Sequence, residues 1–343
     1  MIAVVTGSTG FIGSHLVDAL VARGATVRVI TRPDSAAADG RVTEFRMDVR
    51  DAAAVERSQV WDGATHLFHL AGVTKARTAR AFDDGNVAPL RQLLSAIDRR
   101  AAAAPHVVLV SSQAAGGPAA SAAAAIRETD RPAPIEEYGR SKLRAEHAVL
   151  EFAERMPISI IRLAAVYGPR DRDFLEVFRQ ASGRIAWYAV PPHHQFSLLY
   201  VADAVTGILA AASRQPGPAR VYYLAADEPV TWRSLYRAIA TVAAASPLEL
   251  QLPASLLRAA AAAGDLIGAL TGRAFLLNRQ KLELSRPAYW LCDPARARDE
   301  LGWRPSLTLA EGLAQTLSWY LESGWLRRRG ATPGSGYSKE PRA

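Results

Sequence analysis

The sequence predicts an α/β fold, a doubly wound parallel sheet with a smaller, interleaved C-terminal substrate domain. Three observations lead to this prediction. Short apolar segments alternate with segments of helical periodicity through the first half of the 343-residue chain. A glycine-rich turn joins the first predicted strand to the first predicted helix. Polar residues directly follow several predicted strands, and ligands of parallel α/β sheets bind beyond these strand ends.

The predicted elements follow one another in a regular order. Six short apolar segments are predicted as strands: Ile2–Val5, Thr26–Thr31, Glu44–Met47, His66–Leu70, Val107–Val110 and Ile158–Leu163. The segments between them that have helical periodicity are Phe11–Arg23, a short helix after Asp51 that runs through Val55, Val87–Arg100 and Tyr138–Glu154. Gly24 ends the first helix.

The alternation loosens after Leu163, where prolines and mixed patterns appear. Ser197–Ala211 and Val221–Leu224 are predicted to return to the sheet, so the two domains interleave. We expect a dinucleotide-binding domain over residues 1–168 and 196–226 and a substrate domain over 169–195 and 227–325. Residues 326–343 are expected to form a flexible basic tail.

The turn Thr6-Gly7-Ser-Thr-Gly10-Phe-Ile-Gly13 has the chemistry of a phosphate site. It places the first turn of a helix, with its unpaired N–H groups, against an anionic ligand. Gly7 permits the tight turn, Gly10 lets the backbone approach a pyrophosphate, and Gly13 lets the helix pack close to the strand. The arrangement is typical of the Rossmann type of dinucleotide-binding sheet.

Tyr138 and Lys142 lie at i and i+4 of a predicted helix and therefore share one face. Free tyrosine has a pKa of about 10, and a nearby ammonium favours the phenolate. We therefore expect Lys142 to lower the pKa of Tyr138, which then exchanges a proton with a carbinol oxygen. Ser112, at the end of a strand, is expected to hold the same oxygen, with Ser111 as the neighbouring alternative.

Composition excludes several classes of protein. The net charge of +8 suits anionic ligands, but no aromatic-basic module accompanies it, so nucleic-acid binding is not expected. A single cysteine, Cys292, excludes an intramolecular disulfide framework. No metal site is expected, since no carboxylate at ligand spacing joins His193 and His194.

We expect a cytoplasmic protein without stable membrane insertion. No signal peptide is predicted, because the first residues are needed for the first strand. The most apolar stretch, Leu252 through Leu277, is interrupted by Arg258, Asp265 and Arg273. It is predicted to be a substrate-domain helix, with contact to a membrane surface as the minor alternative.

Taken together, the motifs of residues 1 to about 325 resemble those of the extended short-chain dehydrogenases/reductases, the group labelled NAD-dependent epimerase/dehydratase. The motifs are the glycine turn, Asp48-Val49, His69-Leu-Ala71-Gly72, Asn86, Val110-Ser111-Ser112, Tyr138-Gly-Arg-Ser-Lys142, Val166-Tyr-Gly-Pro-Arg-Asp171, Tyr200-Val-Ala-Asp203 and Leu301-Gly-Trp-Arg-Pro305. The family frequently has a histidine three residues before the later aspartate, Asp203, and this position is Tyr200 here.

The resemblance implies roles for the matching residues. Ser112, Tyr138 and Lys142 become the catalytic triad, Asp48-Val49 lies against the adenine, and Leu70-Ala71-Gly72 lies along the dinucleotide. The other cofactor-binding residues that it implies are Gly7, Thr9, Gly10, Phe11, Ile12, Gly13, Asn86, Val110, Ala165 and Val166. It also implies a homodimer formed by a four-helix bundle of Val87–Arg100 and Tyr138–Glu154.

Cofactor preference is predicted from the end of the second strand, where members that prefer NAD usually carry an acidic residue. Here Thr31 and Arg32 follow Val29-Ile30. Thr31 cannot hold two ribose hydroxyls, whereas Arg32 can pair with a 2′-phosphate. We therefore expect NADP(H) to be preferred over NAD(H).

The motifs are compatible with three functions. The first is an oxidoreductase that transfers a hydride between nicotinamide and a secondary alcohol or ketone of a largely apolar small molecule, because the later region is rich in apolar and aromatic residues. Its motifs look similar to the 3β-hydroxysteroid dehydrogenase and dihydroflavonol reductase subgroup. The alternative is a nucleotide-sugar epimerase or dehydratase with a recycled NAD, in which arginines hold a diphosphate: Arg162, Arg170, Arg172 and Arg184. The intact triad argues against a third function, a non-catalytic cofactor sensor.

Overall fold

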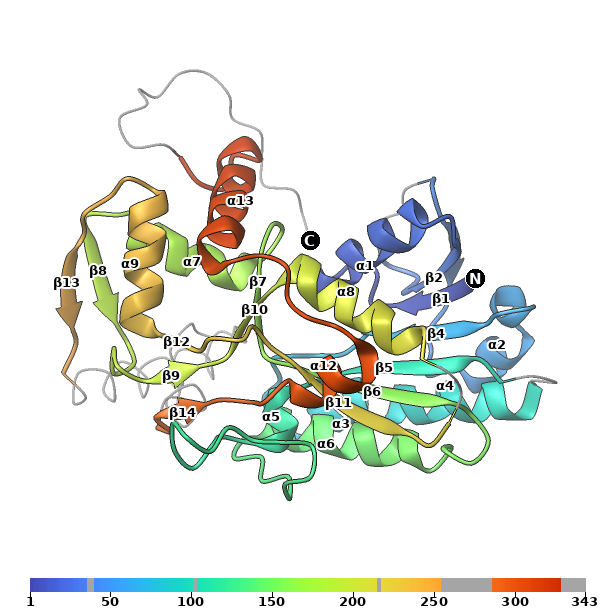
Figure 1. The fold of residues 1–343 in the computed structure, drawn as a ribbon. Coiled ribbons are helices and arrows are strands. Elements are labelled where there is room, and N and C mark those ends of the chain that lie inside the picture. The colour runs from blue at the N-terminus through green and yellow to red at the C-terminus, as the bar shows by residue number, and fades with distance from the viewer. Residues whose placement is uncertain (36–39, 101–103, 215–216, 254–285, 328–343) are drawn as a thin grey trace.

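The computed structural model describes residues 1–35, 40–100, 104–214, 217–253 and 286–327 (Figure 1). The helix predicted within Leu252–Leu277 lies outside the described residues from residue 254 on. The predicted basic tail lies outside them from residue 328 on. Neither prediction is tested.

A seven-stranded sheet in the order β11-β6-β5-β4-β1-β2-β3 forms the centre of the molecule. Every neighbouring pair in it is parallel. Its strands are β1 Ile2–Thr6, β2 Thr26–Thr31, β3 Thr43–Arg46, β4 His66–His69, β5 His106–Ser112, β6 Ile158–Leu163 and β11 Arg220–Leu224. The predicted doubly wound parallel sheet is confirmed.

Helices cover both faces of this sheet (Figure 1). On one face lie α1 (Phe11–Ala22) and α8 (Val201–Ala212), and on the other α2 (Ala52–Arg57), α4 (Ala88–Arg100) and α6 (Glu137–Leu150). Each face has its own apolar core, because strands buried on both sides carry continuous runs of Val, Ile and Leu.

Two helices differ from the prediction. The helix α3 (Ala79–Asn86), capped by Thr78, was not predicted, because its sequence is mostly polar and buries Phe82 and Asn86 alone. The helix α6 ends at Leu150 and not at Glu154. Turns follow, and they bring Phe152 and Met156 into the core. The apolar spacing in the sequence therefore continues past Leu150, which is why the predicted helix was too long.

The rest of the described chain packs around a third apolar core. Its larger elements are α7 (Arg172–Ala181), β8 (Ile185–Tyr188), α9 (Trp232–Val242), β13 (Leu248–Gln251) and α13 (Leu309–Glu322). Short strands join this part to the central sheet: β7 (Ala165–Tyr167) pairs with β10 (Leu198–Tyr200), and β9 (Gln195–Phe196) lies between β12 (Val230–Thr231) and β14 (Tyr289–Trp290).

The chain therefore passes between the two parts more than once. The segment Ser197–Ala211, predicted to return to the sheet, forms β10 and α8, and β10 pairs with β7 outside the central sheet. Much later, α12 (Ala295–Leu301) leads into Trp303, whose indole N–H donates to the Asp203 carbonyl at 3.2 Å and to Thr206 Oγ1 at 3.0 Å in α8. The predicted domain boundaries stay a prediction.

The remaining short helices are η1 (Gln59–Trp61) and α5 (Gln113–Gly116). None of the helices in the described part of the chain is both long and apolar enough to cross a bilayer.

Two histidines at the start of β4 and β5 make stability depend on pH. His106 Nδ1 lies 3.2 Å from the Ala212 carbonyl and Nε2 lies 3.0 Å from Ser159 Oγ, while His66 Nε2 lies 3.1 Å from the same carbonyl. Burial, followed by the neighbouring His66, lowers the pKa of His106 from 6.5 to about 4. The folded protein therefore binds a proton at this site less readily than the unfolded chain.

We expect the stabilisation from neutral His106 to be complete above pH 6.5 and to disappear as the pH falls towards 4. The difference corresponds to about 3 kcal/mol of unfolding free energy. Urea unfolding between pH 7 and pH 4.5 measures this loss. His106→Gln should flatten the pH dependence, whereas the control His147→Gln, at an exposed position of α6, should not. Equal slopes in all three proteins would contradict the assignment.

Candidate active site

The glycine turn between β1 and α1 is packed too closely for side chains. Gly7 has a φ of +74°, and a Cβ there would lie 2.6 Å from the Ala71 nitrogen. A Cβ on Gly13 would lie 2.0 Å from the Gly7 carbonyl oxygen, so α1 can approach the turn only because residue 13 is glycine. A Cβ on Gly10 would meet the Gly7 oxygen alone, at 3.2 Å.

The N-terminus of α1 is open to an anion. Gly10 is the N-cap residue, no side chain caps the helix, and its first turn carries no acidic residue. The first N–H groups of a helix have no partner within the helix, and the helix dipole adds partial positive charge there. Thr9 and Gly10 are exposed and Phe11 and Ile12 are half-buried. This turn fits the pyrophosphate of a dinucleotide.

The segment after β4 lies directly against this turn. The Leu70 N–H donates to the Thr6 carbonyl at 3.1 Å, and the Ala71 N–H donates to Thr6 Oγ1 at 3.3 Å. His69 Nδ1 lies 2.9 Å from the same hydroxyl. The structure thus brings together residues 6–13 and 70–72, the two segments predicted to bind the dinucleotide.

Asn86 links this segment to the helix that carries Tyr138. Its Oδ1 accepts from the Val73 N–H at 2.7 Å, and its Nδ2 donates to the Val73 carbonyl at 3.1 Å and to Ser141 Oγ at 2.9 Å. Asn86 is buried at the end of α3. In this structure its amide positions the loop after Gly72, and its predicted contact with the cofactor stays a prediction.

The two serines at the end of β5 have different partners. The Ser112 hydroxyl is near enough to the Tyr138 hydroxyl to lower its pKa, and it also caps α5 by accepting from the Ala114 N–H at 3.2 Å. Ser111 is buried, and its hydroxyl donates to Glu146 at 2.5 Å. The structure therefore brings Ser112, and not Ser111, to Tyr138.

Lys142 lies on the same helix as Tyr138 but makes a different contact. Its Nζ donates to the Val110 carbonyl of β5 at 2.6 Å, and the side chain is buried. Burial lowers the pKa of Lys142 to about 8, against the opposing effect of Glu146.

The prediction that Lys142 lowers the pKa of Tyr138 is wrong for this structure. Burial raises the pKa of Tyr138 to about 12, and the charge of Glu136 adds to the rise, while the hydrogen bond with Ser112 opposes it. The sequence pattern places the two side chains on one face, but desolvation dominates at that face. The tyrosine is therefore a protonated donor at neutral pH.

The acidic pair before Tyr138 is engaged by the helix itself. Glu136 is the N-cap of α6 and accepts from the Tyr138 N–H at 2.6 Å and the Gly139 N–H at 2.5 Å. Glu137 accepts from Arg140 at 2.6 Å. Both carboxylates therefore serve the N-terminus of α6.

The residues predicted to contact the adenosine half lie along the ends of β2 and β3. Thr31 is buried, and its hydroxyl donates to Glu44 Oε1 at 2.7 Å. Arg32 projects into solvent, with its side chain 82% exposed and Asp34 3.9 Å away. Asp48 accepts from Arg50 at 2.7 Å, which lowers its pKa, and the adjacent Val49 is half-buried. Glu44 is the residue here that the sequence analysis missed.

Beyond β6, the predicted residues Ala165 and Val166 begin β7, with Ala165 exposed and Val166 half-buried. Val110 lies in β5, one residue before the serine pair, where its carbonyl accepts from Lys142.

Three of the four arginines considered for a diphosphate have other partners. Arg162 is buried and pairs with Glu146 at 2.7 Å. Arg170 pairs with Asp18 at 2.8 Å, and the Arg172 guanidinium lies 5.3 Å from the centre of the Trp325 ring. Arg184 is exposed. The Glu146–Arg162 pair was not predicted, although Glu146 follows Lys142 at i+4 and Tyr138 at i+8.

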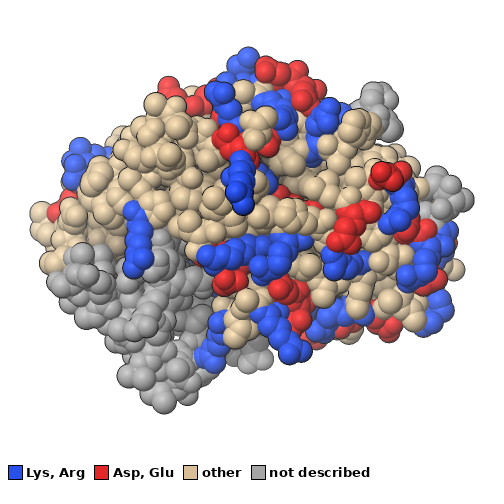
Figure 2. Space-filling model, turned by 90° about the horizontal axis from the view of Figure 1, so that it is seen from below, with Lys and Arg blue, Asp and Glu red and all other residues tan. Residues whose placement is uncertain are grey.

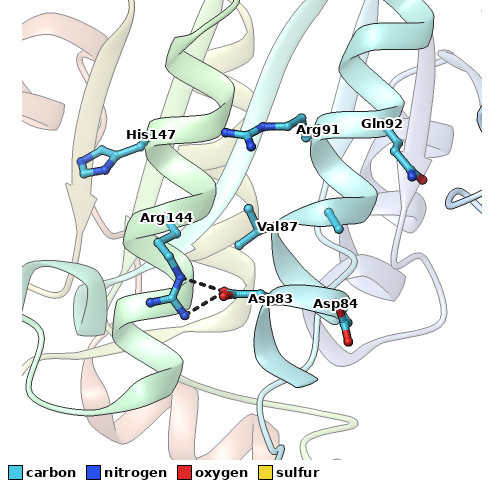
Figure 3. Close-up of a pocket in the computed structure, with 8 residues that line it drawn as sticks. Asp83, Asp84, Val87, Arg91, Gln92, Arg144 and His147 are labelled. Carbon is cyan, nitrogen blue, oxygen red and sulfur yellow. Dashed lines mark hydrogen bonds and ion pairs between the residues drawn. The ribbon is translucent and has the colours of Figure 1, made fainter. Parts of the chain in front are cut away.

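A groove of about 530 Å³ lies on a different face of α6, between that helix and α3–α4 (Figure 3). Asp83, Arg91, Arg144 and His147 line it, and Arg144 bonds Asp83 at 2.7 Å. Figure 2 shows acidic and basic side chains interspersed over this side of the molecule. Two of these helices, α4 and α6, are those predicted to form the dimer. The dimer stays a prediction.

No group of three or more His, Cys, Asp or Glu residues in the described part of the chain is placed to hold a metal ion.

Comparison with known proteins gives one family match and several relatives of similar length. Residues 3–225 match the model of the NAD dependent epimerase/dehydratase family. The chain is 29% identical to a ceramide reductase of Caulobacter vibrioides, over 95% of this chain and 96% of that protein.

Two further relatives also match over nearly their whole length. One is the 4-hydroxy-2-methyl-3-oxo-4-farnesyl-3,4-dihydroquinoline-1-oxide ketoreductase of Stigmatella aurantiaca, 28% identical over 90% of this chain and 93% of that protein. The other is sterol demethylase protein B of Methylococcus capsulatus, 29% identical over 95% of this chain and 100% of that protein.

Among solved structures, UDP-glucose 4-epimerase of Thermus thermophilus in complex with NAD has the same fold. The TM-score is 0.74, with 23% identity over 93% of this chain and 99% of that chain.

Proposed function

The chain belongs to the NAD dependent epimerase/dehydratase family and is an enzyme of the extended short-chain dehydrogenase/reductase type, and from this premise we propose a reaction. In this reaction the enzyme transfers a hydride between nicotinamide and a secondary alcohol or ketone of a largely apolar small molecule. Tyr138 is the general acid/base of this reaction, with Ser112 and Lys142 beside it.

The observation that carries the proposal is the placement of Tyr138. Its hydroxyl lies near enough to Ser112, at the end of β5, for the serine to act on its pKa, and burial keeps the phenol protonated at neutral pH. A protonated phenol next to a serine hydroxyl can donate to a carbonyl oxygen, which is the requirement for reducing a ketone. Two of the relatives named above are a reductase and a ketoreductase, of ceramide and of a farnesylated quinoline oxide.

Each residue then has a defined task. Ser112 holds the substrate oxygen beside Tyr138, and Tyr138 gives that oxygen its proton. Lys142, a cation below its pKa of about 8, donates to the Val110 carbonyl and can also hydrogen-bond the nicotinamide ribose. The turn of residues 7–13 and the segment of residues 70–72 hold the dinucleotide. Nicotinamide, when bound, supplies or accepts the hydride.

The alternative function is a nucleotide-sugar epimerase or dehydratase that recycles a tightly held NAD. The solved epimerase with the same fold makes this a necessary comparison. Two features disfavour it: Arg162, Arg170 and Arg172 have partners within the protein, and Glu136 caps the helix of Tyr138. Binding a diphosphate would need unpaired arginines, and a dehydration step would need an available carboxylate near Tyr138.

The test is a panel of candidate substrates followed by the absorbance of reduced nicotinamide. Long-chain keto lipids, a sterol ketone, simple aromatic ketones and UDP-glucose are each offered with NADPH and with NADH. The proposal expects oxidation of one reduced cofactor per ketone reduced. Conversion of UDP-glucose without net oxidation of cofactor would establish the alternative and overturn the proposal.

Cofactor preference is the finer part of the proposal, and Arg32 carries it. The exposed Arg32 guanidinium at the end of β2 can approach a 2′-phosphate, whereas the Thr31 hydroxyl donates to Glu44. We expect Arg32→Ala to weaken NADPH binding about tenfold, the value of one exposed charge-assisted hydrogen bond. NADH binding should change little.

Fluorescence titration of both reduced cofactors measures this effect, with Arg23→Ala at the exposed end of α1 as the control. An unchanged ratio of the two affinities in Arg32→Ala would refute the NADP preference and leave the reductase proposal standing. The homodimer and the cytoplasmic location also stay predictions.

A further inference from the structure

A buried carboxylate lies one helical turn beyond Lys142. Glu146 is 2% exposed and shares a face of α6 with Tyr138 and Lys142, at spacings of eight and four residues. Its Oε1 accepts from Ser111 Oγ at 2.5 Å, and both of its oxygens accept from Arg162, the shortest contact being 2.7 Å to Oε2. A carboxylate this deeply buried is costly unless it is fully paired.

The partner of this carboxylate ties three strands together. Arg162 of β6 is 4% exposed and lies directly opposite Ser111 of β5 in the parallel register. Its remaining nitrogen, Nη1, donates to the Tyr223 hydroxyl of β11 at 2.9 Å, and its guanidinium lies 5.3 Å from the centre of the Tyr223 ring. Glu146 therefore joins α6 to the ends of β5, β6 and β11 through one buried network.

This network holds both strand residues that the reaction uses. Ser111 lies between Val110, whose carbonyl accepts from Lys142, and Ser112, whose hydroxyl acts on the pKa of Tyr138. The bond between Ser111 and Glu146 fixes the position of α6 along the end of β5. We propose that Glu146 is a positioning residue of this site, holding Lys142 charged and Ser112 in register with Tyr138. The inference rests on the proposed function for its kinetic consequence only.

Glu146, one helical turn from Lys142 on α6, is the charged group that favours the protonated form of this amine. From β4, buried His69 faces Lys142 and is neutral, since burial lowers its pKa to about 3. From β6, Arg162 is a cation bound to Glu146, and on α6 itself Tyr138 is a neutral phenol. Glu136, also on α6, acts on Tyr138. Glu146 is the group that raises the pKa of Lys142 against burial.

The first experiment measures the charge of Lys142 without any substrate. The chain has four lysines, so [ε-13C]lysine labelling gives few signals, and Lys142→Arg identifies the one required. In the wild-type protein this signal should titrate near pH 8. In Glu146→Gln, which keeps the size of the side chain and removes its charge, the midpoint should fall by at least one pH unit. An unchanged midpoint overturns the proposal.

The matched control is a second buried carboxylate, which is far from Glu146 in the sequence and shares none of its hydrogen-bond partners. Asp203 of α8 is 1% exposed and accepts from Ser306 at 2.7 Å. Asp203→Asn should lower the unfolding temperature and leave the Lys142 midpoint unchanged. A shift in this control would show that general destabilisation moves the midpoint, and this result would also overturn the proposal.

A double variant covers the case in which Glu146→Gln does not fold. Glu146→Leu/Arg162→Met replaces the pair by apolar side chains of similar length, an exchange that often preserves stability. The Lys142 midpoint should still fall, because the negative charge of Glu146 is gone. A folded double variant with the wild-type midpoint overturns the proposal.

The kinetic readout is the pH profile of kcat/KM for ketone reduction. Its alkaline limb should move to lower pH in Glu146→Gln by the same amount as the Lys142 midpoint. A shifted midpoint with an unmoved limb overturns the role in the reaction. If no ketone is reduced by the wild-type protein, the proposed function fails, and the lysine titration still decides whether Glu146 sets the charge of Lys142.

Discussion

Tyr138→Phe is expected to lower kcat of ketone reduction about 10²- to 10⁴-fold, the usual contribution of a positioned general acid. Phenylalanine keeps the ring beside Phe82, whose centre lies 6.2 Å away, but has no proton to give. Cofactor affinity should change little, since the glycine turn is untouched. Single-turnover oxidation of NADPH, with cofactor binding measured separately by fluorescence, gives both values.

The matched control for this loss is Tyr222→Phe. The Tyr222 hydroxyl of β11 donates to Glu300 at 2.9 Å, and its removal should cost stability without changing kcat. Undiminished turnover in Tyr138→Phe would remove Tyr138 from the acid/base role. A similar loss in both variants would point to a general effect of deleting buried hydroxyls.

Gly13→Ala is expected to abolish tight cofactor binding. The new Cβ would lie 2.0 Å from the Gly7 oxygen, a backbone atom that cannot rotate out of the way as a side chain can. Overpacking of this kind costs about 1–3 kcal/mol of stability. Because α1 must move away from the turn, its N–H groups no longer point at the pyrophosphate. The affinity for the cofactor should therefore fall at least about tenfold.

Gly40→Ala is the matched control, since a Cβ at Gly40 has no described atom within 4 Å. Denaturant unfolding and fluorescence titration of NADPH and NADH should show Gly40→Ala close to the wild type. Normal affinity for both cofactors in a folded Gly13→Ala protein would mean that the dinucleotide does not bind at this turn.

The fold was predictable because its signals are local. The β1–turn–α1 segment carries its own strand, glycines and helix period, and the parallel sheet follows from repeating that pattern. The helix α3 gave no such signal: its sequence is polar, and tertiary contacts of Phe82 and Asn86 hold it in place. The separate pairing of β10 with β7 likewise depends on contacts that sequence spacing does not encode.

Sequence spacing predicted which of these side chains lie together, and it did not predict their electrostatics. The spacing of Tyr138 and Lys142 correctly placed both on one face of α6. It carried no information on burial, which raises the pKa of Tyr138, or on the Val110 carbonyl, which binds Lys142. Arg162 looked like any other arginine near a substrate region, because its partner Glu146 lies on another element.

The path of the chain limits how this protein can be re-engineered. After β6 it leaves the central sheet, returns for α8 and β11, leaves again, and comes back with α12 to place Trp303 against Asp203 and Thr206. Trp303 is buried in the same core as α1 and the sheet. A chimaera that exchanges everything after β11 for the same stretch of a relative would therefore also exchange a piece of the cofactor scaffold. Transplanting specificity onto this chain requires at least two separate grafts that spare the segment from α12 to Trp303.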